Sequence, residues 1–200
     1  IAVQLKSRVP DGSNAFGLAW LQMNDDFYQL QPNGETDLDA RSLSGHATFS
    51  RRLNIGQVEH QFLTRFTFST GQDDVDRYLN VFSQRGARFG TYEARAYTAA
   101  VSIEDVVWLK PTLAFGVGFT ALHGERKVTG QAPTTNLRSK LTFDDFSPRA
   151  ALLWAPHGNL SLHAAISRSI EPPTFDDLVA REGAYPNLTL GPRSLTPQSA

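Results

Sequence analysis

The feature that most constrains this chain is a period of two in its hydrophobic residues. Between Val58 and Ser69, one set of alternate residues is mostly apolar and the other mostly polar; the first set is Val58, His60, Phe62, Thr64, Phe66 and Phe68. Successive side chains of a β-strand point to opposite faces of a sheet, so this pattern predicts a strand with one apolar and one polar face. Similar runs recur, and we predict eight strands at about 2–9, 16–31, 38–52, 58–70, 91–104, 112–123, 143–154 and 160–169.

The predicted connections between these strands alternate in length. The short ones are Val9–Ala15, Leu53–Gln57, Val106–Pro111 and Ala155–Asn159. The long ones are Pro32–Asp39, Thr70–Gly90, Gly124–Thr142 and the tail from Ile170. In an up-and-down meander every second connection lies on the same side, so tight turns gather at one rim and long loops at the other, as in outer-membrane barrels. The sequence therefore predicts an all-β fold, an antiparallel up-and-down meander that forms part of a transmembrane β-barrel.

Side-chain patterning also distinguishes the faces and the rims of this meander. The convex face should expose a set of apolar side chains to lipid, namely Phe62, Phe66, Phe68, Phe115, Val117, Phe119, Leu162 and Ile166. Trp108 lies in one short connection and Trp154 borders another. Tryptophan suits a membrane–water interface, because its ring is apolar and its N–H needs a hydrogen-bond partner. We therefore expect both indoles at the short-turn rim and the long loops at the opposite rim.

The composition excludes several other classes of protein. The chain has no Cys, which excludes disulfide frameworks, cysteine zinc sites and thiol nucleophiles. Its 19 Lys and Arg against 20 Asp and Glu leave no basic stripe, so no nucleic-acid partner is expected. The uncharged stretch from Thr112 to Leu122 is much shorter than a membrane-spanning helix of about 20 residues. No catalytic, cofactor-binding or metal-binding motif is evident, and we predict that the chain is not an enzyme.

Several motifs of the last quarter occur together and in order. The sequence reads Phe-Ser-Pro-Arg-Ala-Ala-Leu-Leu-Trp from Phe146, Ser-Arg-Ser-Ile-Glu-Pro-Pro-Thr-Phe from Ser167, and Leu-Thr-Pro-Gln from Leu195. These segments resemble the TonB-dependent receptors of the bacterial outer membrane, in which F-S-P-(K/R)-x-(G/A)-L precedes a tight turn and a strand ending in S-R-x-(F/I/Y)-x-P-P-(T/S)-F. The positions that match this pattern are Arg149, Arg168, Pro172, Pro173, Phe175, Leu195, Pro197 and Gln198.

The resemblance implies a barrel of about 22 strands around a separate plug domain, and about eight of those strands would lie in this chain. It also implies a receptor that imports a scarce ligand, with a ferric siderophore as the first candidate and with energy delivered through TonB. We expect residues 1–200 to be an internal piece of the barrel, with the plug and the closing strands elsewhere in the parent chain. The implied partners are that plug, TonB acting through it, the ligand, and the lipid and lipopolysaccharide of the outer membrane.

Two sets of charged residues are candidates for ligand or plug contacts. The first is the most basic of the predicted loops, and it comprises Arg126, Lys127, Arg138 and Lys140. Its charge suits an anionic ferric chelate or, alternatively, the phosphates of lipopolysaccharide. The second set is Glu59, Arg65 and, as the register of the family it resembles implies, Arg149; we expect these in the wet lumen, since the lipid face penalises Arg or Lys by about 2–4 kcal/mol at mid-bilayer. We expect this set to form salt bridges with the plug or within the wall, with direct ligand contact as the second interpretation.

Two further segments have simpler interpretations. Asp73, Asp74 and Asp76 form an acidic cluster that could bind Ca²⁺, but their loop lacks the Gly and the distal Glu of an EF-hand, so a solvated loop is favoured. Thr174-Phe-Asp-Asp has the spacing of an N-terminal helix cap, which predicts a helical turn through Arg181.

Two other functions remain open on the sequence alone. A complete eight-stranded barrel of the OmpA or OmpX type, structural or adhesive in role, fits the strand count. A soluble β-sandwich binding domain also uses alternation and aromatic residues. The motifs after Phe146 argue against the first function, and the regular alternation of short and long connections argues against the second.

Overall fold

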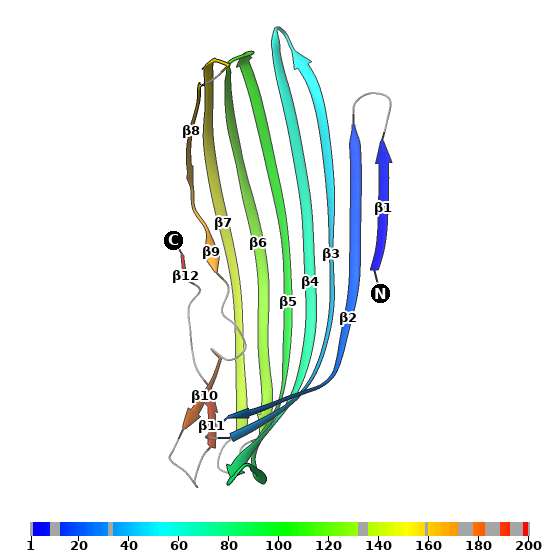
Figure 1. The fold of residues 1–200 in the computed structure, drawn as a ribbon, viewed down its shortest axis with the longest axis vertical. Helices are drawn as coiled ribbons and strands as arrows, with labels where there is room; N and C mark the ends of the chain where they lie inside the picture. Colours follow the sequence, from blue (N-terminus) through cyan, green and yellow to red (C-terminus); the bar gives the residue numbers. More distant parts are fainter. Residues whose placement is uncertain are drawn as a thin grey trace.

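One large sheet dominates the fold. The computed structural model describes residues 2–8, 13–31, 34–131, 136–158, 160–171, 178–182, 189–192 and 198–199. The strands of the sheet are β1 Ala2–Arg8, β2 Asn14–Gln31, β3 Gly34–Ile55, β4 Val58–Val81, β5 Gln84–Lys110, β6 Leu113–Gln131, β7 Asn136–His157 and β8 Leu160–Ser167. Each strand pairs antiparallel with its neighbours in sequence, in the order β1 to β8 (Figure 1). The expected meander is therefore confirmed, and its chain-order pairing differs from the two packed sheets of a β-sandwich.

The C-terminal tail adds two small sheets. β10 (Val179–Glu182) pairs with β11 (Thr189–Pro192), and β9 (Ile170–Glu171) pairs with β12 (Gln198–Ser199). Of the expected helical turn, Leu178 is helical, whereas residues 179–181 belong to β10 instead, and the first part at 174–177 lies outside the described residues. The motif positions Pro172, Pro173 and Phe175 lie outside them too. In the described part of the chain, no helix is long and apolar enough to cross a membrane.

The sheet has two ends, which we call the near rim and the far rim. The near rim carries the tight turns at 56–57 and 111–112, and the far rim carries the turn at 82–83. The tail hairpin β10–β11 also lies at the far end, where β11 contacts β5 and β7 (Figure 1). Trp108 pairs with Glu59, and Trp154 pairs with Leu113, so both indoles are close to the near rim. Their side chains point to opposite faces, however, so only Trp154 is placed to meet lipid as expected.

Pairing across the strands shows which residues share a face. One row crosses the sheet at Ala47, Phe66, Val101, Ala121 and Phe146. This face, which we call the outer face, exposes five of the predicted lipid-facing side chains by 40–76%, namely Phe66, Phe115, Val117, Leu162 and Ile166. The other three, Phe62, Phe68 and Phe119, lie half-buried on the same face. In the half of the sheet next to the near rim, the outer-face residues form an apolar belt. We call the other half, next to the far rim, the far half.

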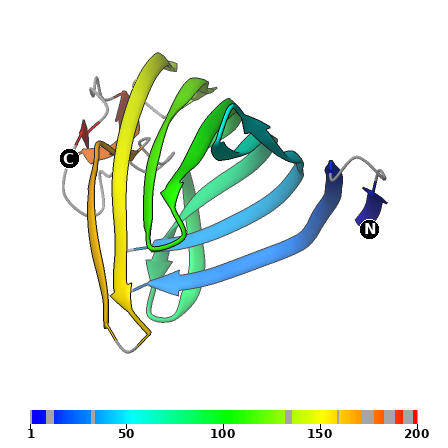
Figure 2. The ribbon, with the colours of Figure 1, turned by 90° about the horizontal axis from the view of Figure 1, so that it is seen from above.

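The opposite face, which we call the inner face, is polar at the level of the belt. It carries Glu59, Arg65 and Arg149, as well as Ser102, whose hydroxyl lies 2.8 Å from that of Thr120. Figure 2 shows the sheet curled into an open trough. The Arg149 side chain of β7 contacts a carboxylate of β5, across β6, and such contacts form most readily on a concave surface. The apolar belt is therefore on the convex side, and the polar face lines the trough.

The strands run much further toward the far rim than the sequence pattern indicates. Thr70–Gly90 and Gly124–Thr142, expected as long loops, are instead mostly the far ends of β4 to β7. Most of Pro32–Asp39 likewise belongs to β3. The asymmetry of the two rims remains, because strands extend beyond the apolar belt only toward the far rim. The residues predicted as long loops mostly form these extensions.

The hydrophobic alternation fails there because it changes phase. Beyond the belt, buried apolar side chains lie on the inner face, among them Val75, Tyr92, Ala94, Val128, Leu137 and Phe143, each at most 6% exposed. The outer face at the same level carries acids such as Asp74 and Glu93. A strand in lipid needs apolar residues outside, whereas a strand in water needs them wherever protein covers it. One uninterrupted strand thus contains two alternations of opposite phase, and a single period of two cannot describe it.

The tail covers the inner face in this far half. Leu178 and Leu190 are each 1% exposed and pack with Val75, Tyr92, Val128 and Leu137 in the one hydrophobic cluster of the described residues. A Cβ on Gly90 would lie 2.4 Å from Leu190 Cδ1, so the close approach of β11 to β5 requires glycine at this position. The tail is therefore docked inside the far end of the trough.

Candidate functional site

The inner face at belt level is held by an ion pair that spans three strands. Arg149 of β7 donates a hydrogen bond to Glu104 of β5, and the side chain crosses β6 at Gly118. A Cβ on Gly118 would lie 2.6 Å from the carbonyl oxygen of Ile103 and 3.2 Å from Arg149 Nε. Glycine at 118 therefore makes room for the arginine. Arg149, expected in the lumen from the family pattern, lies on the inner face and pairs within the wall.

This geometry predicts a difference between two glycines of the same strand. Gly118→Ala should displace Arg149 from Glu104 and destabilise the folded barrel by about 1–3 kcal/mol, the usual cost of overpacking. Gly116→Ala is the matched control, because a Cβ there would meet its nearest atoms only at 3.8 Å. The midpoint of urea unfolding in lipid vesicles measures both. Equal midpoints for the two variants would contradict this role of Gly118.

The other charges of the inner face differ in their surroundings. Arg168, another motif position, pairs with Asp145 at 2.9 Å and donates to the carbonyl oxygen of Phe146 at 3.3 Å. The Asp145 side chain is only 5% exposed and accepts a further bond from Ser147 at 2.7 Å. These contacts tie the end of β8 to β7. Glu59 and Arg65 are exposed on the inner face, and neither forms an ion pair with another described residue.

An aromatic cluster on the inner face was missed by the sequence analysis. The His46 ring of β3 lies between two rings of β2, with centroids 5.4 Å from Phe16 and 6.3 Å from Trp20. The register places all three on the polar side of the sheet, and Trp20 is 38% exposed. No sequence motif marks this cluster, because the register of β2 against β3 brings the rings together. Flat rings on a polar concave surface, of which Trp20 is the exposed one, can stack on a planar ligand or on a plug side chain.

The four basic residues expected in one loop do not converge. They belong to β6 and β7, where alternate side chains face opposite sides. Arg126 lies on the inner face, whereas Lys127 pairs with Lys140 and Thr129 pairs with Arg138 on the outer face. The expectation of a single cationic loop was wrong because both segments are strands.

Arg126 is held in place by its neighbours. Its Nη1 donates to the carbonyl oxygen of Tyr97 and to Thr98 Oγ1, at 2.9 Å each. Its guanidinium carbon also lies 5.4 Å from the centre of the Phe143 ring. Burial lowers the pKa of this guanidinium below its ordinary value, although it stays charged at neutral pH. Arg126 therefore stabilises the inner face of the far half.

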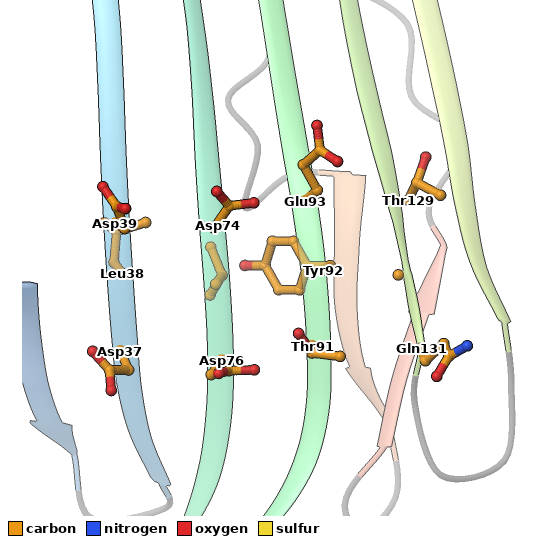
Figure 3. Close-up of a pocket in the computed structure, with 12 residues that line it drawn as sticks. Asp37, Leu38, Asp39, Asp74, Asp76, Thr91, Tyr92, Glu93, Thr129 and Gln131 are labelled. Carbon is orange, nitrogen blue, oxygen red and sulfur yellow. The ribbon is translucent and has the colours of Figure 1, made fainter. Parts of the chain in front are cut away.

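Carboxylates gather instead on the outer face of the far half. Figure 3 shows Asp37 and Asp39 of β3, Asp74 and Asp76 of β4, and Glu93 of β5 around a hollow of about 340 Å³. Arginines pair with several of these acids, as in the 3.1 Å contact of Arg41 with Asp39. The neighbouring Asp73 pairs with Ala94 on the inner face, so the sequence triplet is split between the faces. Among the described residues, no three His, Asp or Glu side chains are placed to hold a metal ion.

The arrangement supports binding and passage rather than covalent chemistry. A trough with an apolar exterior and a polar interior has the pattern of part of a transmembrane β-barrel wall. One polar pair interrupts the apolar belt, where His60 Nδ1 lies 2.8 Å from Asp105 Oδ2, and the two side chains are 18% and 19% exposed. Pairing lowers the cost of both polar groups next to lipid.

Comparison with known proteins agrees with this geometry. The family model described as "TonB dependent receptor-like, beta-barrel" matches residues 4–200. No curated protein matches the sequence. Among solved structures, the siderophore receptor PiuA from Acinetobacter baumannii is similar with a TM-score of 0.73 and 13% identity, over 86% of this chain and 32% of that one.

Two other solved structures are similar to the chain. The ferric citrate transporter FecA in the unliganded form has a TM-score of 0.71 and 14% identity, over 84% of this chain and 26% of that one. The ferric preacinetobactin receptor BauA from Acinetobacter baumannii has a TM-score of 0.60 and 14% identity, over 99% of this chain and 33% of that one. The chain thus spans about a quarter to a third of these receptors. With its family model matched over residues 4–200, this chain belongs to the TonB-dependent receptors of the bacterial outer membrane and forms part of their β-barrel.

Proposed function

We propose that the protein imports an iron–siderophore complex across the outer membrane, with energy supplied through TonB. The family consists of transport receptors rather than enzymes, and the match of its barrel model to residues 4–200 is the observation that carries the proposal. The names of FecA, PiuA and BauA, which describe receptors for iron chelates, support the choice of ligand. In this proposal a plug domain of the parent chain occupies the trough and contacts TonB.

The polar inner face supports a ligand route through the trough. Glu59 and Arg65 are exposed there and are free to pair with a plug, whereas Arg149 is engaged within the wall. The cluster of Phe16, His46 and Trp20 adds flat aromatic rings to the same surface. We propose that these rings contact the imported chelate. They replace the basic loop of the sequence analysis, whose residues lie on two faces.

The double variant Trp20→Ala/His46→Ala in the full-length receptor tests this assignment. We expect about a thirtyfold or larger loss of affinity for the transported ferric siderophore, because truncating a central aromatic contact costs about 2 kcal/mol or more. Binding is measured by quenching of intrinsic fluorescence, and transport by uptake of radioactive iron into cells that depend on this receptor.

Trp154→Ala is the matched control, since this indole is 46% exposed on the outer face. Its affinity for the chelate should equal that of the unaltered receptor. Iron uptake that persists in cells without TonB would contradict the energy source. A double variant that binds the chelate as tightly as the control would exclude these rings from the ligand route.

A further inference from the structure

We propose that two copies of the receptor associate through the outer face of β3–β5, around a two-fold axis beside Phe62 of β4. In this contact, Arg51 of each copy pairs with Asp105 of the other. The surface belongs to the apolar belt and is separate from the ligand route on the inner face. The inference therefore does not depend on which ligand the receptor imports.

The ionisable side chains of the belt are gathered on three adjacent strands. Across β3–β7, from the row of His60 to the row of Phe66, the outer face is apolar apart from one threonine and three ionisable residues, namely Arg51, His60 and Asp105. Arg51 and Asp105 lie in one row, on either side of Phe62. Ionisable groups at membrane depth are costly in lipid and usually pair with other protein groups. Their concentration at one place indicates that protein covers this part of the wall.

The Asp105 carboxylate is only partly satisfied within its own chain. Its Oδ2 lies 2.8 Å from His60 Nδ1, whereas its Oδ1 is buried and has no hydrogen-bond partner among the described residues. The His60 ring stacks on Phe62, with centroids 5.8 Å apart and planes at 10°, and this stack holds the imidazole beside the carboxylate. The Asp105 side chain is 19% exposed, so one edge of it is open to a second molecule. A further donor would lower the cost of keeping this group next to lipid.

Arg51 provides a donor of the opposite charge. It lies exposed on the outer face, where arginine costs about 2–4 kcal/mol at mid-bilayer and less toward the interfaces. Arg51 also interacts within its own chain, but a guanidinium has five N–H donors and can serve a second acceptor. Within one copy, β4 separates Arg51 from Asp105 by two strand spacings, about 10 Å. A second copy can bring the two charges together.

A two-fold axis along the membrane normal, beside Phe62, produces this pairing twice. In an isologous interface, each residue that contacts a second residue is contacted by it in return. Because β4 lies midway between β3 and β5, the rotation sets β3 of one copy against β5 of the other. Phe49, 45% exposed, then faces Ile103, 40% exposed, so the next row pairs apolar with apolar. Every row of the contact is matched in polarity.

The shape of the wall allows such a contact. The outer face is convex (Figure 2), so two copies touch along a narrow line, and only the strand at the line and its two neighbours take part. Barrel strands tilt by about 35–45°, which offsets Arg51 and Asp105 by about 6 Å along the membrane normal. The long arginine side chain spans this offset. Arg51 and Asp105 are thus within the range of a contact centred on β4.

Cysteine cross-linking in outer-membrane vesicles tests the position of the axis. The chain contains no Cys, so a single thiol can be introduced into a cysteine-free full-length receptor. Phe62→Cys should form a disulfide-linked dimer on mild oxidation, because a residue on the axis meets its own copy. Val117→Cys is the matched control, since it lies in the same row of the outer face but two strands from β4. Equal cross-linking of the two variants overturns the contact line.

Complementary charge variants test the Arg51–Asp105 pair. Energy transfer between donor-labelled and acceptor-labelled receptors in lipid vesicles measures association, and heat-modifiable mobility in gels checks that each variant is a folded barrel. Arg51→Asp alone, or Asp105→Arg alone, should weaken self-association at least 100-fold, because like charges then meet at two symmetric places. A mixture of the two variants should associate about as well as the unaltered receptor, because each introduced charge then faces its opposite in the other copy.

This rescue separates the proposed contact from damage to the barrel, since a barrel weakened by its own substitution would not recover on mixing. Self-association of either variant at the level of the unaltered receptor overturns the charge pair, and so does a mixture of folded variants that fails to associate. An unaltered receptor that stays monomeric at every protein-to-lipid ratio shows that lipid or another protein covers this face, and it overturns the proposal.

Discussion

Arginine at position 150 should destabilise the folded barrel by about 2–4 kcal/mol more than arginine at position 151. The two alanines are neighbours in β7, in the middle of the apolar belt, but they face opposite sides. Ala150 lies on the outer face and pairs with Val117 and Ile166, whereas Ala151 lies on the inner face and pairs with Gly116. A guanidinium on the outer face must lose its hydration to lipid, and one on the inner face keeps its water.

The measurement is reversible unfolding of the full-length receptor in lipid vesicles, followed by tryptophan fluorescence. Ala150→Arg and Ala151→Arg add the same charge and volume to the same strand. The difference between their unfolding free energies therefore reports whether each face contacts lipid or water. The same two variants in detergent should differ less, because detergent adapts around a charge. If Ala151→Arg proved the more damaging in vesicles, the two faces would be reversed.

Truncating the buried leucine of β11 should undock the tail from the far half. Leu190 is 1% exposed, packs in the inner-face cluster and fills the space above Gly90. Leu190→Ala should therefore cost about 2–5 kcal/mol of docking free energy, the range for leucine truncation in a packed core. Gly90→Val alters the β5 partner of the same contact and should also undock the tail, since a Cβ there would lie 2.4 Å from Leu190 Cδ1.

Hydrogen exchange of the β10–β11 amides reports this undocking directly. Both variants should exchange these amides faster by a factor of at least 30, while the amides of β4–β7 at belt level stay protected. Leu160→Ala serves as the control, because that side chain is 44% exposed at the near rim. Unchanged protection of β10–β11 in both variants would show that the tail is held by contacts other than this cluster.

The lipid-facing half of the sheet could be predicted from the sequence, and the far half could not. From Val58 to Phe68 a single environment acts on each face, so composition alternates and the strand is visible. From Val75 to Leu79 the buried residues face the tail instead of lipid, and the pattern appears broken although β4 continues to Val81. The strand ends were therefore misplaced, while the strand order and the pairing of neighbours were correct.

The candidate sites depend on the same distinction. Family-pattern arginines such as Arg149 were found from the sequence, because their motif is local. Their partners were not, since Glu104 lies two strands away and becomes a neighbour only through the curvature of the sheet. That Arg126 and Lys127 face opposite sides of the sheet could not be predicted either, because this requires knowing that both lie in a strand rather than in a loop.

By itself, the sequence determined the all-β class, the meander order and the apolar character of the outer face, because these follow from local alternation and short turns. Only the tertiary structure decided which half of each strand faces lipid, which charges meet across the trough, and where the Phe16–His46–Trp20 cluster lies. The physical reason is that burial is set by what covers a face. A tail that returns to the far end of the trough places apolar residues inside, whereas lipid at the belt places them outside.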